Sequence, residues 1–97
     1  MPTYITLISY TQQGAENMKE SPARLDRAKA AIKAAGGEMK AFYLTMGHYD
    51  AVAISEAPSD EAYATIILAI ASAGAIRTET LRAFKEEEYR RIVAALP

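Results

Sequence analysis

The stretch FYLTMGHYDAVAISEA (residues 42–57) decides the fold because it holds two apolar runs on either side of a short polar break. The runs are Phe42–Met46 and Ala51–Ala57. Gly47 opens the break and can adopt positive φ without a steric penalty. Asp50 closes it, and its carboxylate can accept hydrogen bonds from nearby backbone amides. The stretch therefore predicts a β-hairpin with its turn at the break.

On the N-terminal side of this hairpin, the sequence predicts a strand and then a helix. Thr3–Tyr10 is rich in β-branched and aromatic residues, and neither of its faces is charged, which is typical of a central strand. Ser21 is predicted to be the N-cap of a helix whose first residue is Pro22. The pair Gly36-Gly37 ends that helix, and the first strand of the hairpin follows at Glu38–Met46.

On the C-terminal side, Pro58-Ser59-Asp60 predicts the start of a second helix, which ends before Gly74. Residues 64–71 are apolar on nearly all sides, so we expect this helix to be covered on more than one side, by another copy or by the C-terminal helix. A fourth strand is predicted at Ala75–Phe84. Lys85–Leu96 follows as an amphipathic helix with its apolar residues at helical spacing: Tyr89, Ile92, Val93 and Leu96.

The predicted order is β-α-β-β-α-β with an added C-terminal helix, in one domain of 97 residues. This order predicts an α+β fold, a ferredoxin-like plait with two helices on one face of a four-stranded antiparallel sheet. The other sheet face is apolar and calls for a partner, so we expect a homodimer, with a higher homo-oligomer as an alternative. The residues assigned to this interface are Tyr4, Thr6, Ile8 and Tyr10.

Composition narrows the classes of function. Eleven basic and twelve acidic residues give a net charge of −1, which argues against nonspecific binding of nucleic acid. The absence of cysteine excludes disulfides and thiolate ligands, and a single histidine argues against a metal site; we expect neither a metal nor a cofactor. No apolar run is long enough to cross a membrane, and the N-terminus lacks signal-peptide features, so the expected location is the cytoplasm.

Five segments together, in the same order along the chain, resemble the GYD domain family: YITLISYT, SPARL, FYLTMGHYD, SEAPSDEA and IRTETLRAF. The residues corresponding to the Gly, Tyr and Asp of the family name are Gly47, Tyr49 and Asp50. The resemblance implies a dimeric α+β barrel, in which two plaits pack sheet against sheet. It implies no activity, because such barrels include small monooxygenases, haem-modifying enzymes and effector-binding domains, and fold does not fix function.

Two residues of the break are the candidate catalytic pair. His48 can act as a general acid or base near neutral pH, and Asp50 can orient it. The alternative is structural: His48 is a solvated turn residue, and the carboxylate of Asp50 caps backbone amides.

Four further residues are candidate ligand-binding residues. Tyr49 can donate a hydrogen bond to a ligand oxyanion, and Tyr43 and Tyr10 can line a cavity between two sheets. Arg77 can bind a carboxylate or phosphate, or else pair with Glu79. Two functions follow as hypotheses. The first is a dimeric module that binds a small organic molecule between its sheets or at the hairpin, or only assembles. The second is a small cofactor-free enzyme, an oxygenase or isomerase.

Overall fold

The secondary structure follows the predicted order in a computed structural model that describes all of residues 1–97. A short helix and a 3₁₀ turn are added between the first strand and the first long helix. The elements are β1 (Thr3–Tyr10), α1 (Gln12–Glu16), η1 (Met18–Glu20), α2 (Ser21–Ala34), β2 (Glu38–Leu44), β3 (Ala51–Glu56), α3 (Asp60–Ser72), β4 (Ile76–Ala83) and α4 (Glu86–Ala94).

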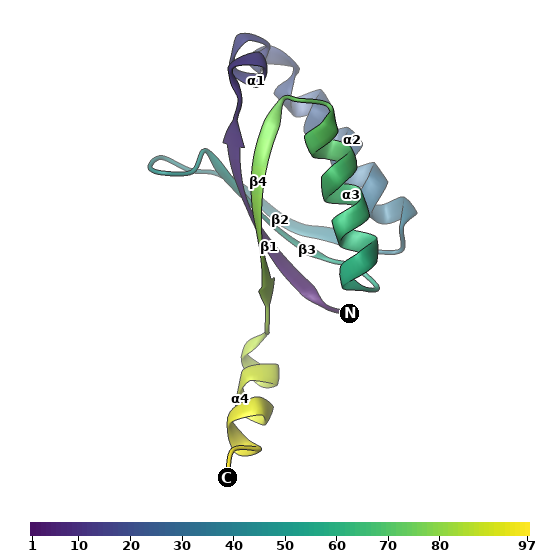
Figure 1. Cartoon of the computed structure of the whole chain (residues 1–97), viewed down its shortest axis with the longest axis vertical. Coiled ribbons are helices and arrows are strands. Elements are labelled where there is room, and N and C mark those ends of the chain that lie inside the picture. The colour runs from purple at the N-terminus through teal and green to yellow at the C-terminus, as the bar shows by residue number, and fades with distance from the viewer.

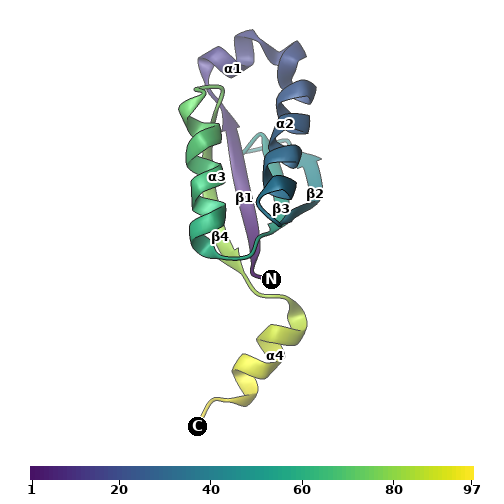
Figure 2. The same cartoon turned by 90° about the vertical axis from the view of Figure 1, so that its right-hand side faces the viewer.

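The four strands form one antiparallel sheet in the order β2-β3-β1-β4. Helices α2 and α3 cover one face of this sheet, and α4 projects beyond the end of β4 (Figures 1 and 2). The predicted α+β plait is confirmed, as is the central position of β1. No helix of the chain combines the length and the apolar character that a membrane span requires.

The local signals explain most of the element boundaries. Gly47 has φ +143°, and the Thr45 amide donates to the Asp50 carbonyl oxygen at 2.9 Å, so the hairpin turn is confirmed. The Ser59 hydroxyl accepts from the Ala62 amide and caps α3 as predicted. The predicted cap at Ser21 is wrong. The chain enters α2 directly from η1, so Ser21 is already helical and makes no capping bond.

The core lies between the sheet and its two helices. The rings of Tyr4 and Tyr63 are stacked with centroids 4.3 Å apart, and the Tyr63 hydroxyl shares a 2.7 Å hydrogen bond with that of Thr6. Ile32 of α2, Ile66 of α3 and Ala57, just after β3, complete the buried cluster.

The assignment of Tyr4, Thr6, Ile8 and Tyr10 to the face opposite the helices is therefore wrong, because these residues face α2 and α3. Alternation along β1 gave two uncharged faces, so sequence alone did not distinguish them.

The open face of the sheet carries the residues of opposite parity. The strand register aligns Ala41, Ile54, Ile5 and Leu81 in one row across all four strands, and Tyr43, Val52, Leu7 and Glu79 in the next. No helix of the chain packs on this face. Its centre is apolar, and its charged residues lie toward the margins.

Helix α4 extends away from the body of the molecule (Figure 1), and the residues of its apolar stripe are exposed to solvent. Tyr89, Ile92, Val93 and Leu96 are all exposed. The outer side of α3 is also exposed to solvent, since Leu68 is 70% exposed. The alternative in which the C-terminal helix covers α3 is wrong, because α4 lies away from it (Figure 1). Cover of α3 by another copy stays a prediction.

Candidate functional site

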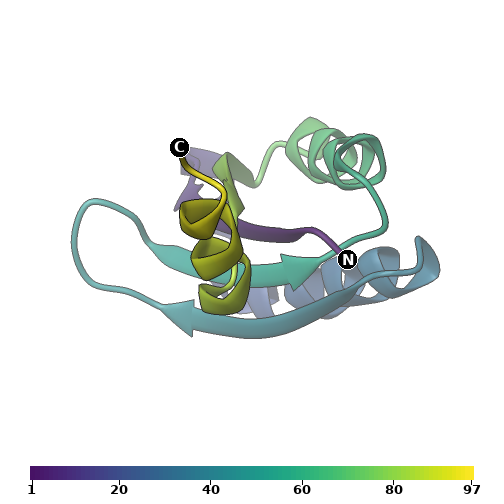
Figure 3. The same ribbon diagram turned by 90° about the horizontal axis from the view of Figure 1, so that it is seen from below.

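The β2–β3 hairpin projects away from the helices, as two perpendicular views show (Figures 1 and 3). Its loop is tied to the sheet by Asp50. The Asp50 amide donates to the Ile8 carbonyl oxygen at 2.8 Å, and its carboxylate accepts from the Tyr10 amide at 2.9 Å. Asp50 thus extends the pairing of the hairpin with β1 by one residue before the first residue of β3, which is the structural role weighed against catalysis.

His48 lies exposed in the same loop, with its ring edge-on to that of Tyr49 at a centroid distance of 4.9 Å and an angle of 84°. No hydrogen bond or ion pair joins His48 to Asp50. The two residues lie close together in the loop sequence, but the Asp50 carboxylate accepts a hydrogen bond from the Tyr10 backbone amide and not from the imidazole. Acid–base catalysis by this pair stays a prediction.

Tyr49 is directed toward the open face and reaches β4. Its hydroxyl donates to Glu79 at 3.1 Å. This hydrogen bond raises the pKa of Tyr49 above its ordinary value, with smaller contributions from burial and from the charge of Glu79. Tyr43 lies in the same cross-strand row as Glu79, at the opposite edge of the sheet.

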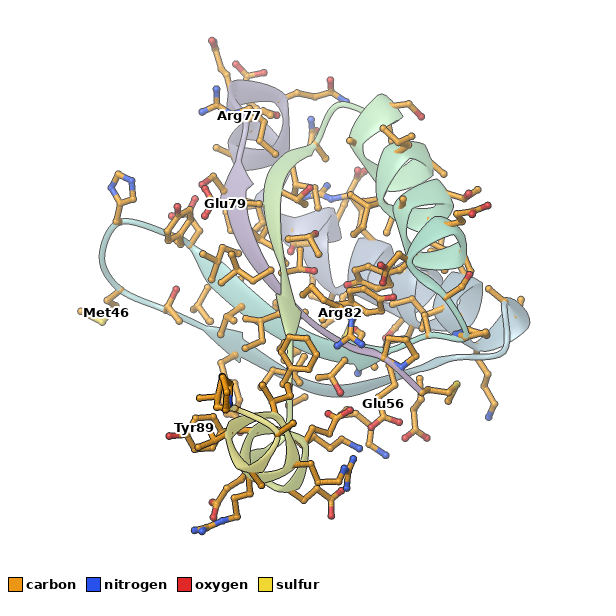
Figure 4. The ribbon with its side chains drawn as sticks, turned by 60° about the horizontal axis from the view of Figure 1, so that its bottom comes forward. Met46, Glu56, Arg77, Glu79, Arg82 and Tyr89 are labelled. Atoms are coloured by element: carbon orange, nitrogen blue, oxygen red, sulfur yellow. The ribbon has the colours of Figure 1, made fainter.

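Arg77 shares the open face with Glu79, two residues along β4 (Figure 4). No ion pair forms between them. Glu79 accepts from Tyr49 instead, and the exposed guanidinium of Arg77 makes no hydrogen bond or ion pair at all. The structure therefore places three predicted ligand-binding residues, Tyr43, Tyr49 and Arg77, on the open face.

Tyr10 does not join them. It lies on the helix-covered side, where its hydroxyl is 3.4 Å from that of Ser21, and it lines a cavity between the helices and the sheet. The prediction that it lines a space between two sheets places it on the wrong side of β1. No group of three or more histidine, cysteine or acidic residues lies close enough to hold a metal ion.

The family model of the GYD domain matches residues 4–93. The chain belongs to the GYD domain family. The three residues that correspond to the family name each have a distinct structural role in this GYD domain. Gly47 supplies the positive φ of the turn, the Tyr49 hydroxyl donates to Glu79, and the Asp50 carboxylate accepts from the Tyr10 amide.

One curated relative of this GYD domain is the "Glutamine synthetase and cystathionine beta-lyase binding protein" of Thermus thermophilus. It is 34% identical over 84 residues, which cover 86% of this chain and 88% of the relative. The name of this relative describes a protein that binds two enzymes.

Solved structures share the fold of this GYD domain. The feast or famine regulatory protein of M. tuberculosis, complexed with L-methionine, has a TM-score of 0.67 at 16% identity; the match covers 88% of this chain and 51% of that one. TTHA0845 from Thermus thermophilus has a TM-score of 0.56 at 26% identity, covering 88% of this chain and 95% of that one. The first likeness shows the fold alone, and this GYD domain spans about half of that regulator.

Two polar clusters of the GYD domain were not predicted from the sequence. The Tyr4 hydroxyl donates to Asp60 at 2.6 Å, and the Arg82 guanidinium lies 3.6 Å from the same carboxylate. Burial, followed by this hydrogen bond, raises the pKa of Tyr4 to about 12.

The second cluster fixes the start of α4, where Lys85 lies 2.7 Å from Glu56. The Lys85 ammonium holds the pKa of Glu56 below its ordinary value. The partners in the two clusters are 22 to 56 residues apart in sequence, so no local motif marks them.

Proposed function

We propose that this GYD domain is a homodimeric binding module: two copies pair their open sheet faces, and a small organic molecule binds between them near the Gly47–Asp50 hairpin. The observation that carries the proposal is the open face itself. Its centre is a continuous apolar surface formed by all four strands, and nothing in the chain covers it. A monomer would leave this surface in water.

The energetic case rests on the five large aliphatic residues of that surface: Ile5, Leu7, Val52, Ile54 and Leu81. Complete burial of one such side chain contributes about 1.5–3 kcal/mol. A second copy presents the same surface, and an isologous pairing would bury both at once. The charged residues at the margins would remain in contact with solvent, as is typical of the rim of an interface.

Helix α4 supports the same assembly. Its apolar stripe has no partner within its own chain, and the ion pair between Lys85 and Glu56 anchors its first turn at the end of the sheet. We therefore propose that α4 packs on the second copy. This contact would extend the interface beyond the two sheets.

The ligand would bind where the apolar face meets its polar margin. Tyr49 and Glu79 offer a hydroxyl and a carboxylate already joined by a hydrogen bond. Arg77 offers a guanidinium without a partner, which suits an anionic group of the ligand. Tyr43 adds an exposed aromatic ring on the far edge. This combination favours a small molecule with both apolar and acidic parts.

Native mass spectrometry of the purified protein tests this proposal. We expect a dimer that retains a small molecule, and we expect Arg77→Gln to keep the dimer but lose that molecule. Arg91→Gln, on the exposed side of α4, is the matched control. A wild-type monomer would contradict the assembly, and a dimer with no ligand in any preparation would contradict the binding role.

A second binding function follows from the relative named for binding two enzymes. We propose that the exposed hairpin also contacts a protein partner, because Leu44 is 73% exposed and Met46 is fully exposed at its tip (Figure 4). Pull-down with purified glutamine synthetase and cystathionine beta-lyase tests this. Retention that Met46→Asp abolishes would support it, and no retention of either enzyme would count against it.

The alternative is a cofactor-free enzyme, an oxygenase or isomerase, that uses His48 as acid–base. The observation in its favour is the contact of His48 with Tyr49 in the loop that would bind the ligand. The bond of Asp50 to the Tyr10 amide weighs against it, since an orienting carboxylate would face the imidazole. If His48→Ala leaves ligand retention and every observed turnover unchanged, the enzyme proposal fails.

A further inference from the structure

We propose that the cavity between α2, α3 and the sheet is a second binding site, which takes a small amphipathic anion with a hydrocarbon body and one carboxylate. This site lies on the opposite side of the sheet from the ligand position proposed above. It is independent of dimer formation through the open face.

The cavity has a volume of about 450 Å³ and lies between the two helices over the strands. Figure 2 shows α2 and α3 on either side of β1, so the sheet forms its floor. Small residues leave this space unfilled: alanines 28 and 31 line it from α2, Ala69 lines it from α3, and Ala73 lines it just beyond the end of α3. The volume lies within the range of about 300–1,000 Å³ that is common for small-molecule sites.

The lining of the cavity is mostly apolar, and its only charges are positive. Of the 23 lining residues, 17 are hydrophobic, and the large ones include Ile8, Phe42, Ile67 and Ile70. The only charged residues among the 23 are two arginines, and none is acidic. An apolar space with positive charge alone favours a ligand with an apolar body and a negative group.

The first two turns of α2 supply the polar end. The Arg24 guanidinium donates to the carbonyl oxygens of Asn17 at 3.1 Å and Gly14 at 3.4 Å, which holds it in place. Arg27 makes no hydrogen bond or ion pair and is available for a carboxylate. The hydroxyls of Tyr10 and Ser21, 3.4 Å apart, line the same end and add donors for the second oxygen.

Calorimetric titration with decanoate and with its neutral counterpart 1-decanol tests the proposal on the full chain. We expect one decanoate per chain and weaker binding of decanol by about fivefold or more, because only the acid pairs with an arginine. Methyl NMR locates the ligand. We expect the methyl signals of Ile8, Ile67 and Ile70 to shift on titration, while those of Ile5, Leu7 and Ile54 on the open face stay in place.

Two pairs of variants separate the cavity from the rest of α2. Ala28→Phe fills the cavity and should abolish decanoate binding, whereas Ala30→Phe, on the exposed side of the same helix, should not. Arg27→Gln should weaken decanoate binding about tenfold and leave decanol unchanged, since it removes one charge-assisted hydrogen bond to the carboxylate. Lys29→Gln is the control for net charge.

Several results would overturn the inference. These are equal affinities for decanoate and decanol, shifts confined to the open-face methyl groups, or full binding by a folded Ala28→Phe. If removal of residues 86–97 raised decanoate affinity, the occupant would be α4 of another copy rather than a small molecule. If Ala28→Phe does not fold, the methyl shifts and Arg27→Gln decide the matter. If decanoate does not bind in this cavity, the proposals of the dimer and of its inter-sheet ligand are not affected.

Discussion

The two faces of the sheet have similar compositions but opposite surroundings. On the helix side, Tyr4 and Thr6 make hydrogen bonds to residues of α3 within the same chain. On the open side, Ile5 and Leu7 have neighbours only along the sheet. Apolar character therefore indicates that a strand face is covered, but it does not indicate whether the cover comes from the same chain.

The comparison also separates two kinds of stability. Changes on the helix side should weaken folding at any protein concentration. Changes on the open side and on α4 should act on association, so their effect should depend on concentration.

The largest effect on folding is expected from Tyr63→Ala on the helix side. It removes the stack on Tyr4 and the hydrogen bond to Thr6, and it leaves a cavity in the core. We expect a loss of about 3–5 kcal/mol in the free energy of unfolding, measured by urea denaturation. Tyr63→Phe, which loses only the hydrogen bond, should cost about 1 kcal/mol. Similar values for the two variants would show that the ring stack is not what holds α3 to the sheet.

Next in size is the effect of α4 on assembly. Replacing Tyr89 and Ile92 by serine should weaken dimerisation by tenfold or more, because about 1.5–3 kcal/mol per buried side chain would be lost at the interface. The stability of the isolated chain should not change, since both residues are exposed there. Dilution monitored by sedimentation velocity measures this, with Arg91→Ser as the control. A dimer unaffected by the double change would place α4 outside the interface.

A smaller effect is expected at the hairpin. Asp50→Ala leaves the half-buried Tyr10 amide without its acceptor and should cost about 1–2 kcal/mol. Asp50→Asn keeps an oxygen acceptor and should cost at most about 1 kcal/mol. Thermal denaturation of the two variants checks the order. An equal loss in both would mean that the negative charge of Asp50, rather than its hydrogen bond, matters.

The last effect is a pH dependence on the helix side that is confined to alkaline pH. The folded pKa of Tyr4 is about 12 against an ordinary value of 10.0, so the fold favours the protonated phenol. Its contribution to stability is complete below pH 10 and is lost as the pH rises toward 12.

Titration of tyrosinate absorbance should show one of the six tyrosines ionising near pH 12. Asp60→Asn should lower that value, because it removes the negative charge beside the phenol. If all tyrosines ionised together near pH 10 in the folded protein, both the burial of the Tyr4 phenol and its bond to Asp60 would be contradicted.

Sequence predicted the fold well because its signals are local. Gly47 and Asp50 mark the turn, Ser59 marks the start of α3, and each strand carries β-branched or aromatic residues between such signals. These features depend on residues within a few positions of one another. They fix the order of elements and, through right-handed crossovers, the topology.

Sequence did not predict which face of β1 meets the helices. Tyr4 and Ile8 on one side and Ile5 and Leu7 on the other are equally apolar, and the deciding partner, Tyr63, is far away in the chain. An amphipathic helix such as α4 likewise shows which of its sides is apolar but not which surface covers it. The Tyr49–Glu79 bond joins residues 30 positions apart, so the candidate site became visible only in three dimensions.

The measurement that tests the central claim most directly is sedimentation equilibrium of the wild type, Leu7→Glu and Leu68→Glu. Leu7 lies at the centre of the open face, and Leu68 is exposed on the outer side of α3. A charge buried in an interface costs several kcal/mol, so Leu7→Glu should sediment as a folded monomer. The wild type and Leu68→Glu should sediment at twice the chain mass. A monomeric wild type, or a Leu7→Glu variant that remains dimeric, would contradict the account.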